Sequence, residues 1–237
     1  MKALSPNCLD DFLFSNATDR LTLELILQRR LPFPLAGKSG ILLHGTWGTG
    51  KSTLAQLLPG LLETAYSDAW DLAQGVKSMP VHEPDHCLTE MFRCGGGLSS
   101  TSIVQTVNNL TDKHPLWHFS QHNYFVFDEV DRLTTGAQQS LRSTMDQPRC
   151  MFFFTTNYVS KIDRGIINRC HLVEMNQVTS ACAYVSLGQS ILKNMGIGPD
   201  VVTHTTLEGF AAQARGSLRD FTTAVVMQAI SLGGAVP

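Results

Sequence analysis

The stretch GTWGTGKSTL, residues 45–54, decides the fold of this chain. It follows the short apolar run GILLH (40–44) and fits the pattern G-x-x-x-x-G-K-[ST]. Between a strand and a helix, such a loop wraps a phosphate with backbone N–H groups, while its lysine reaches the outer phosphates and its hydroxyl binds Mg²⁺. We therefore expect ATP and Mg²⁺ as cofactors, held by Gly45, Thr46, Trp47, Gly48, Thr49, Gly50, Lys51, Ser52 and Thr53.

Apolar runs alternate with amphipathic stretches along the first 175 residues. Strands are expected at 40–44, 86–92, 123–131, 150–157 and 170–175. Helices are expected at 16–30, 51–58 and 100–110, and from Thr134 or Thr135 to Asp146, with Pro59-Gly60 ending the second of them. This alternation is typical of a parallel sheet with helices on both faces.

The apolar strands stop after Met175, and three helices are expected at 179–195, 205–215 and 217–232. The sequence thus predicts an α/β domain over residues 1–175, including an N-terminal helical segment (1–39), and a small all-helical domain over 176–237.

Polar side chains follow two of the expected buried strands. Asp128 and Glu129 end the run FVFDE (125–129), and Asn157 follows FFFTT (152–156). Ligands of open α/β sheets bind at the carboxyl ends of the strands. There Asp128 is expected to hold Mg²⁺ with Ser52, Glu129 to act as general base, and Asn157 to orient a water.

Two arginines stand near the ends of expected elements. Arg169 directly precedes the last strand, and Arg219 lies in the first turn of a helix that Ser217 can cap. A cation at a helix N-terminus opposes the helix dipole. Arg219 therefore either extends into solvent or faces an anion.

The order and spacing of these motifs resemble the AAA+ ATPases. DEVDRLTTGAQQSLRSTMD (128–146), FFFTTNYVSKIDRGIINRC (152–170) and GSLRDFTTAVVMQ (216–228) resemble the small motor subunits of DNA sliding-clamp loaders. The resemblance implies a P-loop fold with a parallel five-stranded sheet and a helical lid. It also implies an ATPase in which Asn157 and Arg219 sense the γ-phosphate, and Arg169 is an arginine finger acting in trans.

The resemblance also implies partners. A finger in trans requires a ring or spiral of identical or related chains, and clamp loaders act on DNA and on a clamp or another protein client. Two features depart from that family: the chain stops at Pro237 after the lid, so we expect no C-terminal collar, and Thr46-Trp47 replaces the usual Pro-Pro.

The composition of the chain bears on its cellular location but does not identify a binding partner. The chain has 237 residues and a net charge of −2, so a DNA-binding surface would have to be a local patch. Six cysteines without a CxxC pair favour reduced thiols, and a cytoplasmic protein without membrane attachment is expected. His82, His86, Cys87 and Cys94 lack a recognised zinc spacing, which disfavours a zinc site.

Two classes of client stay open. DNA could be contacted by Ser100, Thr101 and Ser102 at an expected helix start, with Lys161 and Arg164 as weaker candidates. Alternatively, a protein-remodelling ring would grip a polypeptide with an aromatic residue of a central loop, for which Met91-Phe92-Arg93 is the candidate.

Overall fold

The computed structural model describes residues 6–74, 88–111, 122–178, 180–198 and 201–234. Within them, five parallel strands form one sheet of order β2-β3-β4-β1-β5. The strands are β1 (Gly40–His44), β2 (Leu88–Arg93), β3 (Asn123–Asp128), β4 (Cys150–Thr156) and β5 (Cys170–Glu174). The expected parallel sheet is confirmed, including the described part of the strand expected at 86–92. The strand expected at 123–131 is too long: it ends at Asp128, because Glu129 is left-handed and a 3₁₀ turn follows at Val130–Arg132.

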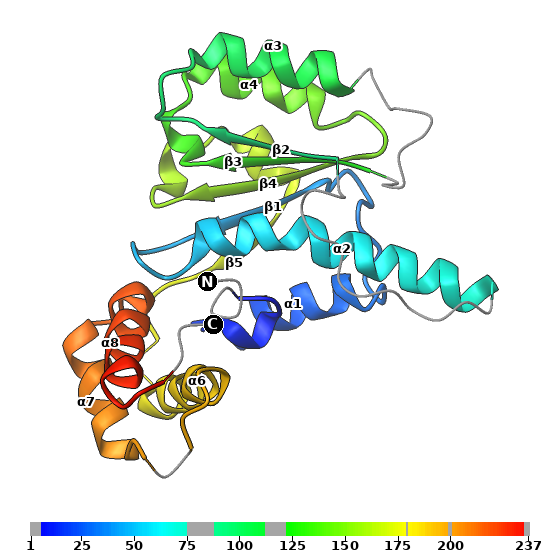
Figure 1. Cartoon of the computed structure of the whole chain (residues 1–237). Coiled ribbons are helices and arrows are strands. Elements are labelled where there is room, and N and C mark those ends of the chain that lie inside the picture. Colours follow the sequence, from blue (N-terminus) through cyan, green and yellow to red (C-terminus); the bar gives the residue numbers. More distant parts are fainter. Residues whose placement is uncertain (1–5, 75–87, 112–121, 179, 199–200, 235–237) are drawn as a thin grey trace.

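Helices cover both faces of the sheet (Figure 1). One face packs against α1 (Ala17–Leu27) and α2 (Lys51–Gln74). The other packs against α3 (Ser100–Thr111), α4 (Thr135–Thr144) and α5 (Arg164–Asn168). Short 3₁₀ turns lie at Leu9–Asp11, Val130–Arg132 and Val159–Lys161.

The side chains of β3 and β4 alternate between the two faces, as a strand period of two requires. Phe125, Phe127, Phe152 and Phe154 stack in pairs in one core, while Tyr124, Val126, Met151 and Phe153 pack in the other. The unbroken apolar run of β4 therefore reflects burial on both sides.

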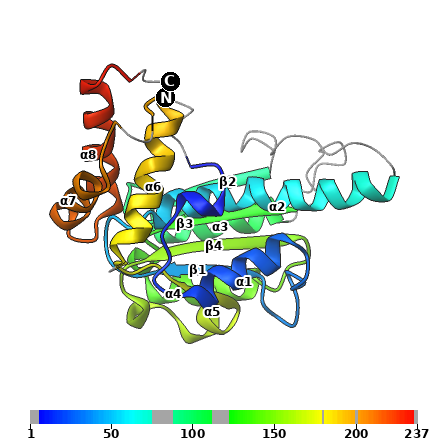
Figure 2. The same cartoon turned by 90° about the horizontal axis from the view of Figure 1, so that it is seen from below.

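The C-terminal helices form a third core beside the sheet. They are α6 (Ala181–Asn194), α7 (His204–Ala214) and α8 (Leu218–Ser231) (Figures 1 and 2). This core contains Tyr184, Leu207, Phe221 and Val225. We call this unit the lid. The proposed boundary at residues 175–176 falls between β5 and α6.

Two expected helix ends are wrong. The helix after the glycine loop continues through Pro59 to Gln74. A proline inside a helix costs about 3 kcal/mol, but Leu54, Leu58 and Leu62 are fully buried on this helix, and their packing outweighs the lost hydrogen bond. The first helix starts after its expected cap Asn16 but ends at Leu27, before Arg29, whose φ is +57°.

No helix in the described ranges is both long enough and apolar enough to cross a membrane.

The central strand β4 provides a test of the two-layer core. Phe153→Ala is expected to lower the free energy of unfolding by about 3–5 kcal/mol, because it leaves a cavity among fully buried neighbours. Leu172→Ala on the edge strand β5, where the side chain is 41% exposed, should change it by less than about 0.5 kcal/mol. Chemical denaturation followed by circular dichroism measures both, and equal losses would contradict the assigned layers.

Candidate functional site

A cleft of about 540 Å³ lies at the carboxyl ends of β1, β3 and β4, where the sheet meets the lid. Elements from the N-terminal segment to α8 contribute to its wall, so chain segments far apart in sequence converge there. Its lining comprises Pro6, Phe12, Trp47, Gly48, Thr49, Gly50, Lys51, Ser52, Thr53, Asp128, Glu129, Thr155, Thr156, Asn157, Leu218, Arg219, Thr222 and Thr223.

The glycines of the loop between β1 and α2 are required by close packing. Gly48 has φ +75°, and a Cβ there would lie 2.7 Å from Ser217 Oγ of the lid. Gly50 has φ +93°, and its Cβ would approach the Phe12 ring to 3.2 Å. Any side chain at these positions would strain the backbone and push the lid or the N-terminal segment away.

Lys51 is buried at the start of α2. Its ammonium group donates hydrogen bonds to the carbonyl oxygens of Gly45 (3.1 Å) and Thr46. Burial lowers the pKa of Lys51 to about 8, and nearby Asp128 offsets part of this change. A phosphate in the cleft would supply a further anion for this buried cation.

Asp128 is held by two hydroxyl groups at the end of β3. Ser52 and Thr155 each donate a hydrogen bond of 2.6 Å to Asp128 Oδ1. The Thr155 hydroxyl also accepts a hydrogen bond from the Glu129 backbone N–H (3.0 Å). The threonine thus joins β4 to both acidic residues of β3.

The pair of Ser52 and Asp128 provides oxygen ligands only, which suits Mg²⁺. Their side chains are already in contact, so they could bind one ion together with a nucleotide phosphate. Bound there, Mg²⁺ would neutralise phosphate charge.

Glu129 begins a sharp turn out of the sheet. Its backbone is left-handed (φ +56°), and the next three residues form a 3₁₀ turn. Its carboxylate forms an ion pair of 2.9 Å with Arg132, and both side chains are about half exposed. The strained turn presents the carboxylate at the cleft rather than within the sheet.

Asn157 contributes to the cleft from the sheet and Arg219 from the lid. Asn157 directly follows β4, and its Oδ1 is buried without a hydrogen-bond partner. The backbone N–H of Arg219 donates to Gly48 O (3.2 Å), which ties the start of α8 to the glycine loop. The Arg219 side chain is exposed and lines the cleft, so the helix-start arginine faces the predicted anion site.

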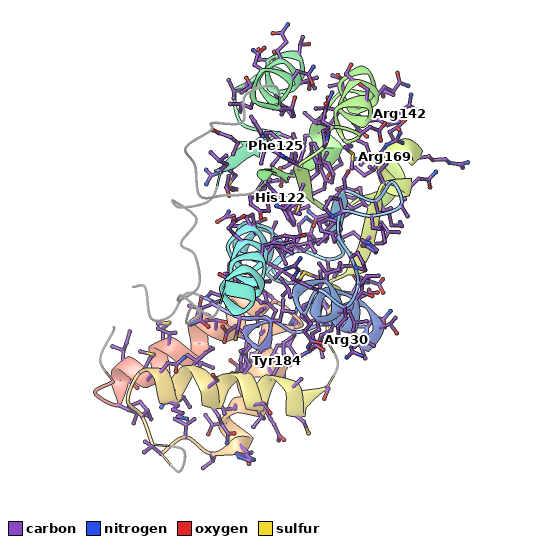
Figure 3. All side chains as sticks on the ribbon, turned by 90° about the vertical axis from the view of Figure 1, so that its right-hand side faces the viewer. Arg30, His122, Phe125, Arg142, Arg169 and Tyr184 are labelled. Carbon is purple, nitrogen blue, oxygen red and sulfur yellow. The ribbon has the colours of Figure 1, made fainter. Side chains whose placement is uncertain are left out.

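Arg169 is not part of this cleft. It precedes β5 at the edge where the parallel strands begin, and Figure 3 shows it beside Arg142 at one margin of the molecule. Its guanidinium forms two hydrogen bonds of 2.8 Å with the Asp146 carboxylate. The five residues of β1 separate the two edges by about 16 Å at about 3.3 Å per residue, so Arg169 cannot serve its own cleft.

The structure brings together every predicted site residue except Arg169, Gly45 and Thr46. The last two line a smaller adjoining cavity with Trp47 and Asn157. Sequence reasoning missed Thr155, although its hydroxyl and that of Thr156 were visible between a buried strand and Asn157. It also missed the apolar wall formed by Pro6, Phe12 and Leu218, for which the sequence offers no local pattern.

The disfavoured zinc site falls largely outside the described residues, which exclude His82, His86 and Cys87. The remaining candidate, Cys94, is a buried thiol whose pKa is raised to about 12 by burial and by neighbouring carboxylates. In the described ranges no cluster of three or more His, Cys, Asp or Glu side chains could hold a metal ion.

Fold and cleft together define a P-loop nucleotide-binding domain with a helical lid. The sequence model of the "ATPase family associated with various cellular activities (AAA)" matches residues 41–177. The chain belongs to this family, and nucleotide binding follows from that membership.

Among curated proteins, the chain is similar to subunits of replication complexes. It is 26% identical to DNA polymerase III subunit tau of Bacillus subtilis, over 82% of this chain and 34% of that protein. It is 25% identical to DNA polymerase III subunit gamma of Buchnera aphidicola, over 81% of this chain and 52% of that protein. It is 27% identical to replication factor C subunit 3 of Arabidopsis thaliana, over 57% of this chain and 43% of that protein. The chain thus spans about a third to a half of these relatives.

Among solved structures, the chain resembles the RuvB Holliday junction branch migration motor of Thermotoga maritima, with a TM-score of 0.59 and 18% identity. The P216G variant of the same protein gives a TM-score of 0.64 and 15% identity. Each alignment covers 94% of this chain and 64% of the other. At this identity the likeness supports the fold alone.

The low pKa of Lys51 leads to a pH-dependent stability difference. An unfolded lysine with a pKa near 10.5 binds more protons than the folded one between pH 8 and 10.5, so stability of the wild type rises over that window relative to Lys51→Met. Any excess in the free energy of unfolding of Lys51→Met over that of the wild type should therefore shrink by up to about 3 kcal/mol between pH 8 and pH 10.5.

Unfolding midpoints of the two proteins without nucleotide, measured from pH 7 to 10.5, test this. A difference independent of pH would contradict the assigned pKa. Nucleotide should raise the midpoint of the wild type and leave that of Lys51→Met unchanged, because the variant lacks the phosphate-binding cation.

Proposed function

We propose that this chain is an ATP-hydrolysing switch of the clamp-loader type, which works as an oligomer on DNA or on a DNA-replication complex. The observation that carries the proposal is the separation of the proposed catalytic groups between two edges of the sheet. All but one converge on the cleft, while Arg169 lies at the opposite edge. A neighbouring chain that presents its Arg169 edge to this cleft would complete the site.

Each cleft residue then has a role in phosphoryl transfer. Lys51 binds the outer phosphates, and Ser52 with Asp128 holds Mg²⁺. Glu129 accepts a proton from the attacking water, which Asn157 orients. Arg219 contacts the γ-phosphate from the lid, so that lid position depends on the nucleotide. The second copy's Arg169 stabilises the charge that develops in the transition state.

DNA as the client is supported by the names of the relatives and by the geometry at two helix starts. The Ser100 hydroxyl at the start of α3 accepts a hydrogen bond from the Thr134 backbone N–H, the cap of α4 (3.2 Å). Thr101 and Ser102 are exposed there. Two helix N-termini side by side, with hydroxyl groups between them, suit the phosphates of a nucleic acid backbone.

The protein-remodelling alternative has less support. Phe92, its candidate gripping residue, is 5% exposed and stacks on Phe127 with ring centroids 5.1 Å apart. A side chain fixed in the core of the sheet cannot grip a passing polypeptide.

The trans arrangement is tested by mixing variants. Arg169→Ala should retain nucleotide binding and lose hydrolysis by about 10³-fold or more, as expected for an arginine finger. Glu129→Gln should also be inactive. Their equimolar mixture should regain phosphate release, because Glu129→Gln chains supply Arg169 to intact clefts of Arg169→Ala chains. The matched control for Arg169→Ala is Lys193→Ala, which removes a cation from the surface of the lid instead.

An inactive mixture of two chains that both bind nucleotide would reject the finger in trans, and unchanged hydrolysis in Glu129→Gln would reject its role as base. The mass of the ATP-bound complex gives the number of chains.

The DNA hypothesis predicts that primed double-stranded DNA stimulates phosphate release. A carboxylate at the start of α3 should repel phosphate, so Thr101→Glu should reduce the ratio of stimulated to basal turnover. Thr106→Glu, on an exposed position further along the same helix, should leave the ratio near that of the wild type. Stimulation should weaken steeply with salt. Absence of stimulation together with absence of DNA retention would reject DNA as the client.

A further inference from the structure

Trp47 is an exposed aromatic residue on the rim of the nucleotide cleft. Its side chain is 66% exposed, and it meets the Tyr158 ring edge to face with centroids 6.3 Å apart. Tyr158 is itself exposed and carries the Lys161 ammonium 4.2 Å from its ring centroid. Large aromatic side chains left in water are characteristic of contact surfaces, where tryptophan and tyrosine supply much of the binding energy.

Two buried polar atoms lie beside this aromatic pair. Thr46 Oγ1 and Asn157 Oδ1 are both buried without hydrogen-bond partners. Both residues line the adjoining cavity of about 320 Å³, together with Trp47. Buried acceptors are normally satisfied, and a guanidinium, with five N–H donors and an affinity for aromatic faces, would satisfy them at this place.

The opposite edge of the sheet carries a hollow next to Arg169. A cavity of about 350 Å³ is lined by residues 34–39 and 145–149, among them Leu35, which is 55% exposed. Asp146 belongs to this wall and also holds the Arg169 guanidinium. Lys38 donates a hydrogen bond of 2.6 Å to Cys170 O, so the loop of residues 34–39 packs directly against the segment that bears Arg169.

The hollow is apolar enough and large enough for an indole. Pro34, Leu35, Met145 and Pro148 contribute to its wall, and its volume lies within the range of about 300–1,000 Å³ typical of small-ligand pockets.

Each of the two edges carries charges of both signs, so a contact between them can pair opposite charges. The cleft edge presents the carboxylates of Asp128 and Glu129 beside the cations of Lys51 and Arg219. Lys38, Asp146 and Arg149 line the hollow at the Arg169 edge. A protruding aromatic group on one edge and a hollow of matching size on the opposite edge fit a head-to-tail contact between copies.

We propose that Trp47 inserts into the hollow formed by residues 34–39 and 145–149 of a second copy of this chain, and so guides that copy's Arg169 to the cleft. The proposal rests on the proposed trans mechanism and adds the contact that positions the finger. Trp47 is a positioning residue here, and the unpaired oxygens of Thr46 and Asn157 mark where the guanidinium arrives.

Photocrosslinking of the full chain tests this contact. Benzoylphenylalanine replaces Trp47 in the Glu129→Gln background, so that ATP stays bound, and irradiated adducts are mapped by mass spectrometry. We expect adducts between chains within residues 34–39 or 145–149. The matched control carries the same probe at Met227, which is equally exposed (66%) but lies on the lid, and it should not label these segments. Adducts confined to the same chain, or to another part of the second copy, would overturn the proposal.

A second measurement separates this contact from the finger itself. Leu35→Glu should raise the chain concentration needed for half-maximal hydrolysis by about 30-fold, the loss typical of a disrupted hot spot, with the nucleotide Kd unchanged. Mixing Leu35→Glu with Trp47→Ala should restore hydrolysis, because one intact contact forms between the two variants.

If Arg169→Ala retains full activity, the proposed function fails. If Arg169→Ala is inactive while Leu35→Glu and Trp47→Ala match the wild type in concentration dependence, only the Trp47 contact is rejected.

Discussion

The parallel pairing of β1 with β4 and β5 is the constraint on which the rest of the structure depends. It aligns Gly40 with both Phe152 and Cys170, and His44 with both Thr156 and Glu174. All strand ends of one kind therefore meet at one edge. The glycine loop and Asn157 follow strand ends at the carboxyl edge and Asp128 ends β3 there, whereas Arg169 precedes a strand at the other edge. Strand direction alone thus divides the proposed catalytic groups between two surfaces of the molecule.

The glycine loop and the lid are in direct contact. Ser217 lies so close to Gly48 that a Cβ there would be 2.7 Å from the Ser217 Oγ. The Gly48 carbonyl oxygen also accepts a hydrogen bond from the Arg219 backbone N–H. Phe12 and Leu218 flank Gly50 from the N-terminal segment and from the lid. If a ligand changes the backbone conformation of the glycine loop, the start of α8 must therefore shift with it or adjust its contacts to the loop. Packed interfaces of this kind shift between discrete arrangements rather than deform gradually.

The sequence predicted the sheet and most of the cleft because both depend on local patterns. Runs such as FFFTTN encode a buried strand and the polar residue that follows it, and the glycine loop encodes its own geometry. Pro59 misled the prediction, since tertiary packing of α2 outweighs its local cost. The contacts of Thr155 with Asp128 and Glu129 could not be read, because they join neighbouring strands whose order the sequence does not state.

The ion pair between Arg169 and Asp146 is a feature that local sequence patterns do not show. The position of Arg169 before β5 was visible in the sequence, but its partner Asp146, which follows the C-cap of α4, was not. The pair is partly exposed, and exposed ion pairs contribute about 0–1 kcal/mol, so release of the guanidinium would cost little. While the pair is formed, the carboxylate limits the rotamers of the arginine and holds it at the edge of the molecule. In the proposed arrangement in trans, the ion pair would therefore lower the entropy lost on docking of Arg169 without binding the side chain too tightly to be released.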